Sequence, residues 1–213
     1  MSPGERGRSY GKTVVVLGAS GPYGSAVARM LAHEGANLAL GGRNREQLEA
    51  LQKEVEASGG RALVVGTHLA KRHYPVHLVE AAVEQFGGLD ALLFMAYSSA
   101  PPLESLDVGA WERSVDVNLK GFLYSGAAAL PALCEGPGGH VIALGVESAA
   151  SADSLYRAAL ASVRALVEEL NDGFPGRGIS ADFLMSRQDP EQCAETMRQA
   201  LLGTADPDRH PGG

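Results

Sequence analysis

Short apolar runs rich in β-branched residues alternate with segments of helical spacing along almost the whole chain. The first run, residues 13–17, ends in a glycine, and residues 23–34 then place alanines and a leucine at helical spacing. Strands that are buried on both faces have continuous apolar sequences, so this alternation predicts a parallel sheet covered by helices on both faces. Right-handed crossovers between successive strands then give a single doubly wound, Rossmann-type α/β domain.

The same alternation predicts where the elements lie. We expect strands at residues 13–17, 37–40, 61–65, 89–95, 140–144 and 179–184. We expect helices at residues 23–34, from the Asn44 capping box onward, from Pro75 to residue 86, at about 108–133, at 153–171 and from Asp189 to about 203. The result is a sheet of six to seven strands in one domain at residues 13–203, with flexible tails at 1–12 and 204–213 that are rich in glycine, proline and charge.

Composition excludes several classes of protein. Of the 213 residues, 45% are hydrophobic and 20% are charged, which is typical of a globular chain and not of a disordered one. A formal net charge of −7 argues against a nucleic-acid-binding surface. No apolar run approaches the ~20 residues of a membrane helix, and residues 1–12 lack the apolar core of a signal peptide. We therefore expect a cytoplasmic protein that binds neither nucleic acid nor membrane.

A glycine-rich turn joins the first strand to the first helix. It has the sequence Gly-Ala-Ser-Gly-Pro-Tyr-Gly at residues 18–24. Glycines at this position allow a tight turn and let backbone N–H groups approach a pyrophosphate at the helix N-terminus. The context of strand, turn and helix predicts a dinucleotide site, and the alternative is a plain connection between two elements.

The residues after the second strand bear on which dinucleotide binds. NAD-preferring sites place an acidic residue there for the ribose hydroxyls, but residues 40–44 are Leu-Gly-Gly-Arg-Asn. Arg43 is suited to bind a 2′-phosphate with two hydrogen bonds, so the sequence favours NADP(H). The alternative is a solvated arginine at the start of a helix.

Together with these features, Asp-Val-Asn-Leu-Lys-Gly at residues 116–121 and the uninterrupted run 156–179 resemble the short-chain dehydrogenase/reductase family. The resemblance spans roughly residues 13–202. It implies NAD(P)(H) binding and hydride transfer to or from a carbonyl carbon. It also implies a catalytic tetrad of Asn, Ser, Tyr and Lys, of which Asn118 and Tyr156 match two members: the asparagine that holds a water and the tyrosine that transfers the proton.

The other two members of the tetrad are missing. Leu160 stands where the family has lysine, four residues after Tyr156, and no lysine follows Lys120. The serine is expected about thirteen residues before the tyrosine, but residues 142–147 carry no hydroxyl. Bringing a phenol pKa from ~10 to about 7 takes roughly 4 kcal/mol, much of which the family's ammonium supplies. We therefore expect ordinary ketone–alcohol chemistry to be crippled or absent, unless Arg164, one turn beyond Leu160, supplies the positive potential.

Further departures surround the cofactor site. The family's Asn-Asn-Ala-Gly is Phe-Met-Ala-Tyr at residues 94–97, its adenine-holding acid is replaced by His68 and Leu69, and its middle glycine is Pro22. The segment that covers substrate after the sixth strand is nearly absent. We assign the cofactor contacts to Gly18, Ser20, Gly21, Tyr23, Gly24, Arg43, His68, Leu69 and Ala96.

Three functions stay open. The first is a divergent family member with weak or unusual oxidoreductase activity on a small carbonyl-type or polyketide-like substrate. The second is a cyclase, dehydratase or isomerase that uses Glu147, Asp153 or Tyr156 as an acid or base, although Asp153 also suits a helix cap. The third is an inactive binding or partner subunit. We expect no metal, because Pro75 places His73 ahead of the helix that carries His77, and the family implies a homodimer or homotetramer.

Overall fold

The structure is a computed structural model that describes residues 9, 11–99, 104, 107–136, 138–147, 154–173, 178–187 and 189–201. The strands are β1 (Thr13–Leu17), β2 (Asn37–Gly42), β3 (Arg61–Gly66), β4 (Ala91–Phe94), β5 (Gly139–Val146) and β6 (Ile179–Ser186). The helices are α1 (Pro22–His33), α2 (Arg45–Ala57), α3 (His73–Phe86), α4 (Val108–Val115), η2 (Asp116–Lys120), α5 (Gly121–Glu135), α6 (Ser154–Gly173) and α7 (Pro190–Leu201). The tails expected at 1–12 and 204–213 lie largely outside these residues.

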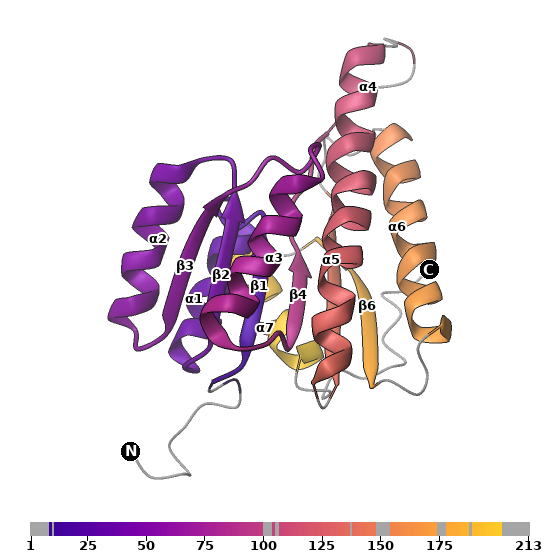
Figure 1. The fold of residues 1–213 in the computed structure, drawn as a ribbon. Coiled ribbons are helices and arrows are strands. Elements are labelled where there is room, and N and C mark those ends of the chain that lie inside the picture. The colour runs from indigo at the N-terminus through magenta and orange to yellow at the C-terminus, as the bar shows by residue number, and fades with distance from the viewer. Residues whose placement is uncertain are drawn as a thin grey trace.

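The described strands form one parallel sheet of six strands in the order β3-β2-β1-β4-β5-β6 (Figure 1). The order reverses between β1 and β4, so the chain first builds one half of the sheet and then crosses to build the other. This topology confirms the doubly wound domain that the alternating pattern predicts. In such a fold, ligands bind at the carboxyl ends of the strands beside the point of reversal.

Two apolar layers hold the helices against the sheet. On one face, Val14 and Val16 of β1 belong to the cluster that packs against α1, α2 and α7. On the other face, Val15 and Leu17 belong to the cluster that packs against α3, α5 and α6. Alternate residues of one buried strand therefore serve both layers, which explains why its sequence is apolar without a break.

Several elements differ from the expected bounds. The helix expected at about 108–133 is α4 and α5 joined by a π-helical segment, η2, which the apolar periodicity does not distinguish from α-helix. Strands β5 and β6 each run two residues further than expected, and Val146 pairs with Ser186. The expectation that His73 precedes its helix is wrong: α3 begins at His73, and Pro75 lies in the first turn, where a missing N–H costs no helical hydrogen bond.

The outer strand β6 is protected by a side chain. The Asn171 amide of α6 donates a hydrogen bond to the carbonyl oxygen of Ala181 and accepts one from its N–H, both at 2.8 Å. Both backbone groups of a residue on the open edge are thereby satisfied. Among the described residues, no helix is both long and apolar enough to cross a membrane.

Candidate functional site

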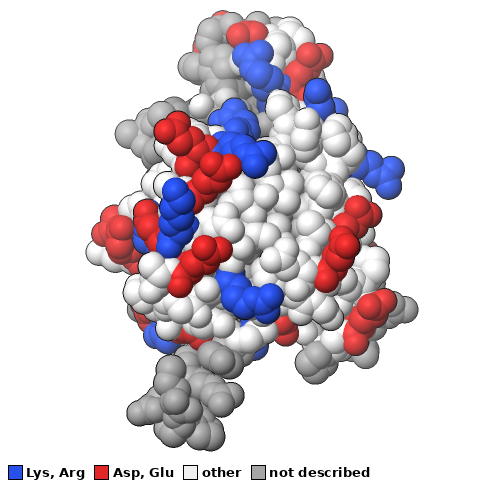
Figure 2. All heavy atoms as spheres, turned by 60° about the vertical axis from the view of Figure 1, so that its left-hand side comes forward, with Lys and Arg blue, Asp and Glu red and all other residues white. Residues whose placement is uncertain are grey.

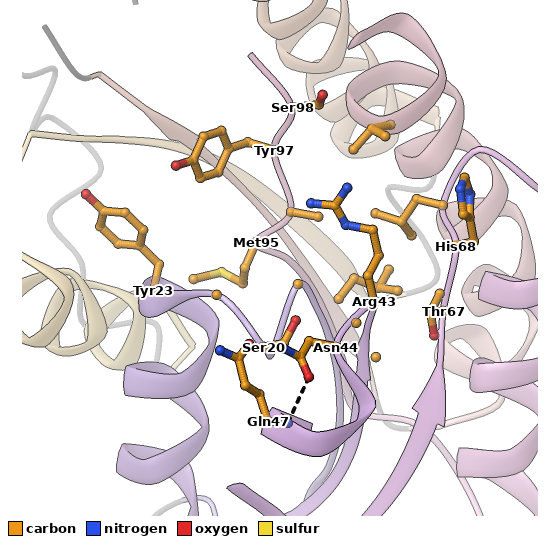
Figure 3. Close-up of a pocket in the computed structure, with 18 of the residues that line it drawn as sticks. Ser20, Tyr23, Arg43, Asn44, Gln47, Thr67, His68, Met95, Tyr97 and Ser98 are labelled. Carbon is orange, nitrogen blue, oxygen red and sulfur yellow. Dashed lines mark hydrogen bonds between the residues drawn. The ribbon is translucent and has the colours of Figure 1, made fainter. Parts of the chain in front are cut away.

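A cavity of about 990 Å³ opens at the carboxyl ends of the strands (Figure 3). Its walls come from the turns that follow β1, β2, β3 and β4 and from the facing side of α4 and η2. All nine assigned cofactor contacts except Gly24 line it, and Gly24 lies buried in the first turn of α1 beneath it. This volume lies at the upper end of the range of small-molecule sites.

The glycine turn forms the floor of the cavity, and the backbone conformation explains its composition. The N–H groups of Gly18 and Ala19 both donate to the carbonyl oxygen of Gly41, at 2.8 and 2.9 Å. Gly18 has φ +84°, and a Cβ there would lie 2.7 Å from the backbone nitrogen of Ala96. A Cβ on Gly24 would collide with the Gly18 carbonyl oxygen. The turn therefore brings two backbone segments into a contact that only glycine permits.

The N-terminus of α1 faces the cavity in a form that suits an anion. The N-cap is Gly21, which has no side chain to occupy the free N–H groups, and Pro22 is the first helical residue. The first turn carries no acidic residue that would neutralise the positive end of the helix dipole. These are the features of a phosphate site at a helix N-terminus.

Positive side chains line the other part of the cavity. Arg43 projects into it from the end of β2, while Asn44 caps α2 by accepting a hydrogen bond from Gln47 N–H at 3.1 Å (Figure 3). The arginine and histidine lining residues in the described part of the chain are Arg43, Arg45, His68 and Arg113, and no described Asp or Glu lines the cavity. Arg45 pairs with Glu49, whereas Arg43 and Arg113 form no ion pair with a described carboxylate. In a chain of net charge −7, this local excess of cations selects for an anionic ligand.

Asn118 lies in the π-helical segment and is 2% exposed. Its Nδ2 donates to the Ser98 carbonyl at 2.7 Å and to Ser114 Oγ at 2.9 Å, and its Oδ1 accepts from Ser98 N–H at 2.8 Å. The extra residue of a π-turn re-aims side chains on a helix, and here Asn118 holds the chain segment that leaves β4. In this structure the Asn118 amide therefore positions one wall of the cavity.

Tyr156 is separated from the cavity. Its side chain is 3% exposed, its hydroxyl accepts a hydrogen bond from Val146 N–H at 3.0 Å, and it is not among the described lining residues. Tyr97, which is 47% exposed and does line the cavity, lies against it with ring centroids 6.3 Å apart. The structure thus does not bring the two assigned catalytic side chains, Asn118 and Tyr156, to the cavity surface together.

Apolar side chains fill the region where the resemblance places the serine and the lysine. A Cβ on Gly145, near the end of β5, would lie 3.0 Å from Leu160 Cδ1 and 3.2 Å from Phe183 Cζ, and would collide with Met185. Arg164 lies over the Phe183 ring, 5.1 Å from its centroid. Ser148 and Asp153 fall outside the described residues.

Glu147 follows β5 and forms a two-point ion pair with Arg187, which follows β6. Arg187 Nε and Nη2 donate to the carboxylate at 2.6 and 3.1 Å. These hydrogen bonds lower the pKa of Glu147 and raise the pKa of Arg187. A carboxylate with a lowered pKa is a poor proton donor near neutral pH, which weighs against the non-redox role that the sequence left open for it. Among the described residues, no group of three His, Cys, Asp or Glu side chains is arranged for a metal.

Sequence reasoning missed several lining residues. Thr67 follows β3 and is buried, with its hydroxyl donating to the Val65 carbonyl at 2.9 Å. Ser98 follows β4, and Arg113 lies one helical turn before Val117 on the face of α4 and η2 that borders the cavity. The i, i+4 spacing of Arg113 and Val117 was the available signal, because both then share a helix face.

Comparisons with known proteins agree with this geometry. A family profile described as short chain dehydrogenase matches residues 12–185. Glycine betaine reductase ATRR of Emericella nidulans is 35% identical over 183 residues, which are 84% of this chain but 14% of that protein. The uncharacterized oxidoreductase Lin0452 of Listeria innocua is 36% identical over 163 residues, 75% of this chain and 66% of its own length. The crystal structure of a metagenomic short-chain oxidoreductase in complex with NADP superposes with a TM-score of 0.83 at 24% identity, over 93% of this chain and 92% of that one.

Proposed function

The chain belongs to the short-chain dehydrogenase family, and on that premise we propose that it binds NADP(H) and has a weak or unusual oxidoreductase activity on a small carbonyl-type or polyketide-like substrate. The observation that carries the proposal is the cavity at the glycine turn, which is lined by arginines and by no described acid. The NADP named with the similar metagenomic structure supports the same cofactor.

The residues present fit this cofactor. The backbone of residues 18–24 and the start of α1 would hold the pyrophosphate, because glycine lets the chain approach closely and the helix end is positive. Arg43 would bind the 2′-phosphate, and the absence of an acid after β2 removes the repulsion that such a phosphate would meet. His68, Leu69 and Ala96 would flank the adenosine from the turns after β3 and β4.

The reaction side of the site is atypical. The bound cofactor would supply a hydride, and Tyr156 is the one inherited proton donor. This phenol has Leu160 where the family has a cation, and its hydroxyl already accepts a hydrogen bond from Val146 N–H. Mistuned acid–base catalysis forfeits on the order of 10²–10⁴ in rate, so we propose slow turnover and not the brisk ketone reduction of the family.

We also propose that the protein is cytoplasmic and forms a homodimer or homotetramer. On α5 the exposed residues Leu123, Ala127 and Pro131 follow one another at i, i+4 spacing and form an uncharged stripe. The face in Figure 2 likewise has a broad area without Lys, Arg, Asp or Glu, with charges gathered around it. An uncharged surface of this kind suits a second copy of the chain.

Isothermal titration calorimetry with NADPH and NADH tests the cofactor assignment. We expect Arg43→Ala to weaken NADPH about 10–100-fold and NADH less than about threefold, because a hydrogen-bonded charge contributes about 1.5–3 kcal/mol. Arg45→Ala is the matched control, since it removes a neighbouring rim charge that is already paired with Glu49. Equal losses for both dinucleotides would reject the phosphate assignment, and no binding of either to the wild type would reject the proposed function.

A further inference from the structure

The cavity borders one half of the sheet and only the beginning of the other. Its described lining residues come from the turns after β1, β2, β3 and β4 and from α4 and η2, and none comes from the described parts of β5, α6, β6 or α7. In a doubly wound domain, a dinucleotide extends across the point of strand reversal, with one mononucleotide on each half. The cavity therefore corresponds to one mononucleotide half and the pyrophosphate.

Tyr97 stands at the point where the cavity would continue. Figure 3 shows the rings of Tyr97 and Tyr23 at one end of the cavity and Arg43 and His68 at the other. The Tyr97 ring is 47% exposed on the cavity side and contacts the ring of Tyr156, which is 3% exposed. Tyr97 thus lines the cavity and contacts Tyr156, which does not line it.

The region behind Tyr97 offers little for a nicotinamide riboside to bind. The hydroxyl of Tyr156 accepts the Val146 N–H. Leu160 and Phe183 crowd the space over Gly145, and the adjacent cation, Arg164, lies over the Phe183 ring. In the cavity, Arg43 and His68 therefore lie at one end, whereas the other end presents the rings of Tyr23 and Tyr97. The described side chains packed over Gly145 are apolar.

From this asymmetry, we propose that the cavity recognises the 2′-phosphoadenosine half of its ligand, and that Tyr97 excludes the nicotinamide half. The inference rests on the proposed NADP(H) binding and specifies it further. On this proposal, the affinity for NADP(H) comes from phosphate recognition by Arg43 and the glycine turn. Arg113 adds positive charge on the opposite wall. The low activity then has two causes: the missing tetrad residues, and steric exclusion of the nicotinamide by the Tyr97 side chain.

Calorimetric titration of the full chain with NADPH, adenosine 2′,5′-bisphosphate and nicotinamide mononucleotide tests the proposal. For the wild type, we expect NADPH and the bisphosphate to have dissociation constants within tenfold of each other, and the mononucleotide to give no detectable heat. Tyr97→Gly should strengthen NADPH by at least threefold relative to the bisphosphate, because it opens the covered end. Tyr97→Phe is the matched control, which keeps the ring and should leave the ratio at its wild-type value.

Two results would overturn the proposal. The first is that the wild type binds NADPH more than tenfold tighter than the bisphosphate. The second is that the ratio of the two dissociation constants in Tyr97→Gly lies within threefold of the wild-type ratio. Failure of the proposed function looks different, because neither nucleotide would then bind the wild type. Tyr97→Ala provides a second opened variant if the glycine variant does not fold. Its ratio is judged by the same threshold.

Discussion

The two halves of the sheet end in surfaces of opposite character. After β1, β2 and β3, the turns present glycine backbone, a helix N-terminus and Arg43 to an open cavity. Near the ends of β5 and β6, the space over Gly145 is filled by Leu160, Phe183 and Met185. One half therefore presents groups that suit a phosphate, while the described side chains around Gly145 in the other half are apolar. Binding and chemistry in this fold depend on different groups, so a chain can lose one and keep the other.

The two halves meet at the segment that leaves β4. Its backbone at Ala96 packs on Gly18, and Asn118 holds Ser98 through hydrogen bonds to both its N–H and its carbonyl. Tyr97 lies between these two anchored residues, so its backbone is fixed on both sides. A substitution at Tyr97 therefore changes the contact with Tyr156 while the backbone on either side keeps its anchors. It is the most direct test of how the two halves differ.

The largest effect is expected in the first half, from Gly18→Ala. The new Cβ would meet the Ala96 backbone at 2.7 Å in a residue with φ +84°, so we expect a loss of about 2–5 kcal/mol in the free energy of unfolding and loss of nucleotide binding. Urea unfolding and calorimetry measure these. Gly59→Ala is the control: it has φ +92° but nothing within 4 Å, and should cost about 1–2 kcal/mol without touching binding. Equal costs for both variants would mean that the turn is not packed as described.

In the second half, Tyr156→Phe should lower stability as well as remove the proposed proton donor. Removing the hydroxyl leaves the Val146 N–H without its 3.0 Å partner, which costs about 1–3 kcal/mol for a buried donor. Nucleotide affinity should change less than about threefold, because Tyr156 does not line the cavity. Tyr74→Phe, on the half-buried face of α3, should stay within about 0.5 kcal/mol of the wild type. A nucleotide affinity that falls with Tyr156→Phe would show that the halves are not separate.

Leu160→Lys restores the family's cation, and we expect it to raise the rate of NADPH-dependent reduction of a small diketone by less than about tenfold, equivalent to ~1.4 kcal/mol. The added ammonium would still face a phenol that is bonded to Val146 N–H and covered by Tyr97. Ala161→Lys, at the next and exposed position of α6, controls for added charge. A rise of a hundredfold or more from Leu160→Lys alone would show that the second half lacks a charge and nothing else.

The smallest effect concerns the ion pair at the rim of the second half. Hydrogen bonds from Arg187 lower the pKa of Glu147, so its folded pKa lies below its unfolded one. The stability from this pair is therefore present above the unfolded pKa, near 4.3, and is lost as pH falls through the folded value. Glu147→Gln should slightly reduce the drop in melting temperature between pH 6 and pH 3. Glu80→Gln, an exposed glutamate without an ion pair to a described residue, should leave that drop unchanged.

The local patterns predicted the architecture because each carries its own physical cause. The unbroken apolar strands, the Asn44 cap and the glycine turn depend on neighbours in sequence, and the structure confirms them. The π-helical segment was not predictable, because its apolar spacing is the same as that of the helices on either side. The family resemblance likewise rests on short contiguous motifs, and the profile match confirms it.

The missed parts of the site depend on contacts between distant segments. Glu147 and Arg187 are brought together only because β5 and β6 end side by side. The contact of Tyr97 with Tyr156 joins the end of β4 to α6, and nothing in either local sequence indicates it. The absence of lysine and serine was visible in the sequence, but the apolar side chains that occupy their place follow from the packing over Gly145.

The amide of Asn171 has a consequence for how these molecules behave at high concentration. By occupying the N–H and carbonyl of Ala181, it takes up the hydrogen bonds that a strand from another molecule would need at that register. An open sheet edge can pair with a strand of another molecule and lead to aggregation, and the Asn171 side chain blocks that pairing at this residue. The edge is thereby closed at Ala181 to a strand from another molecule.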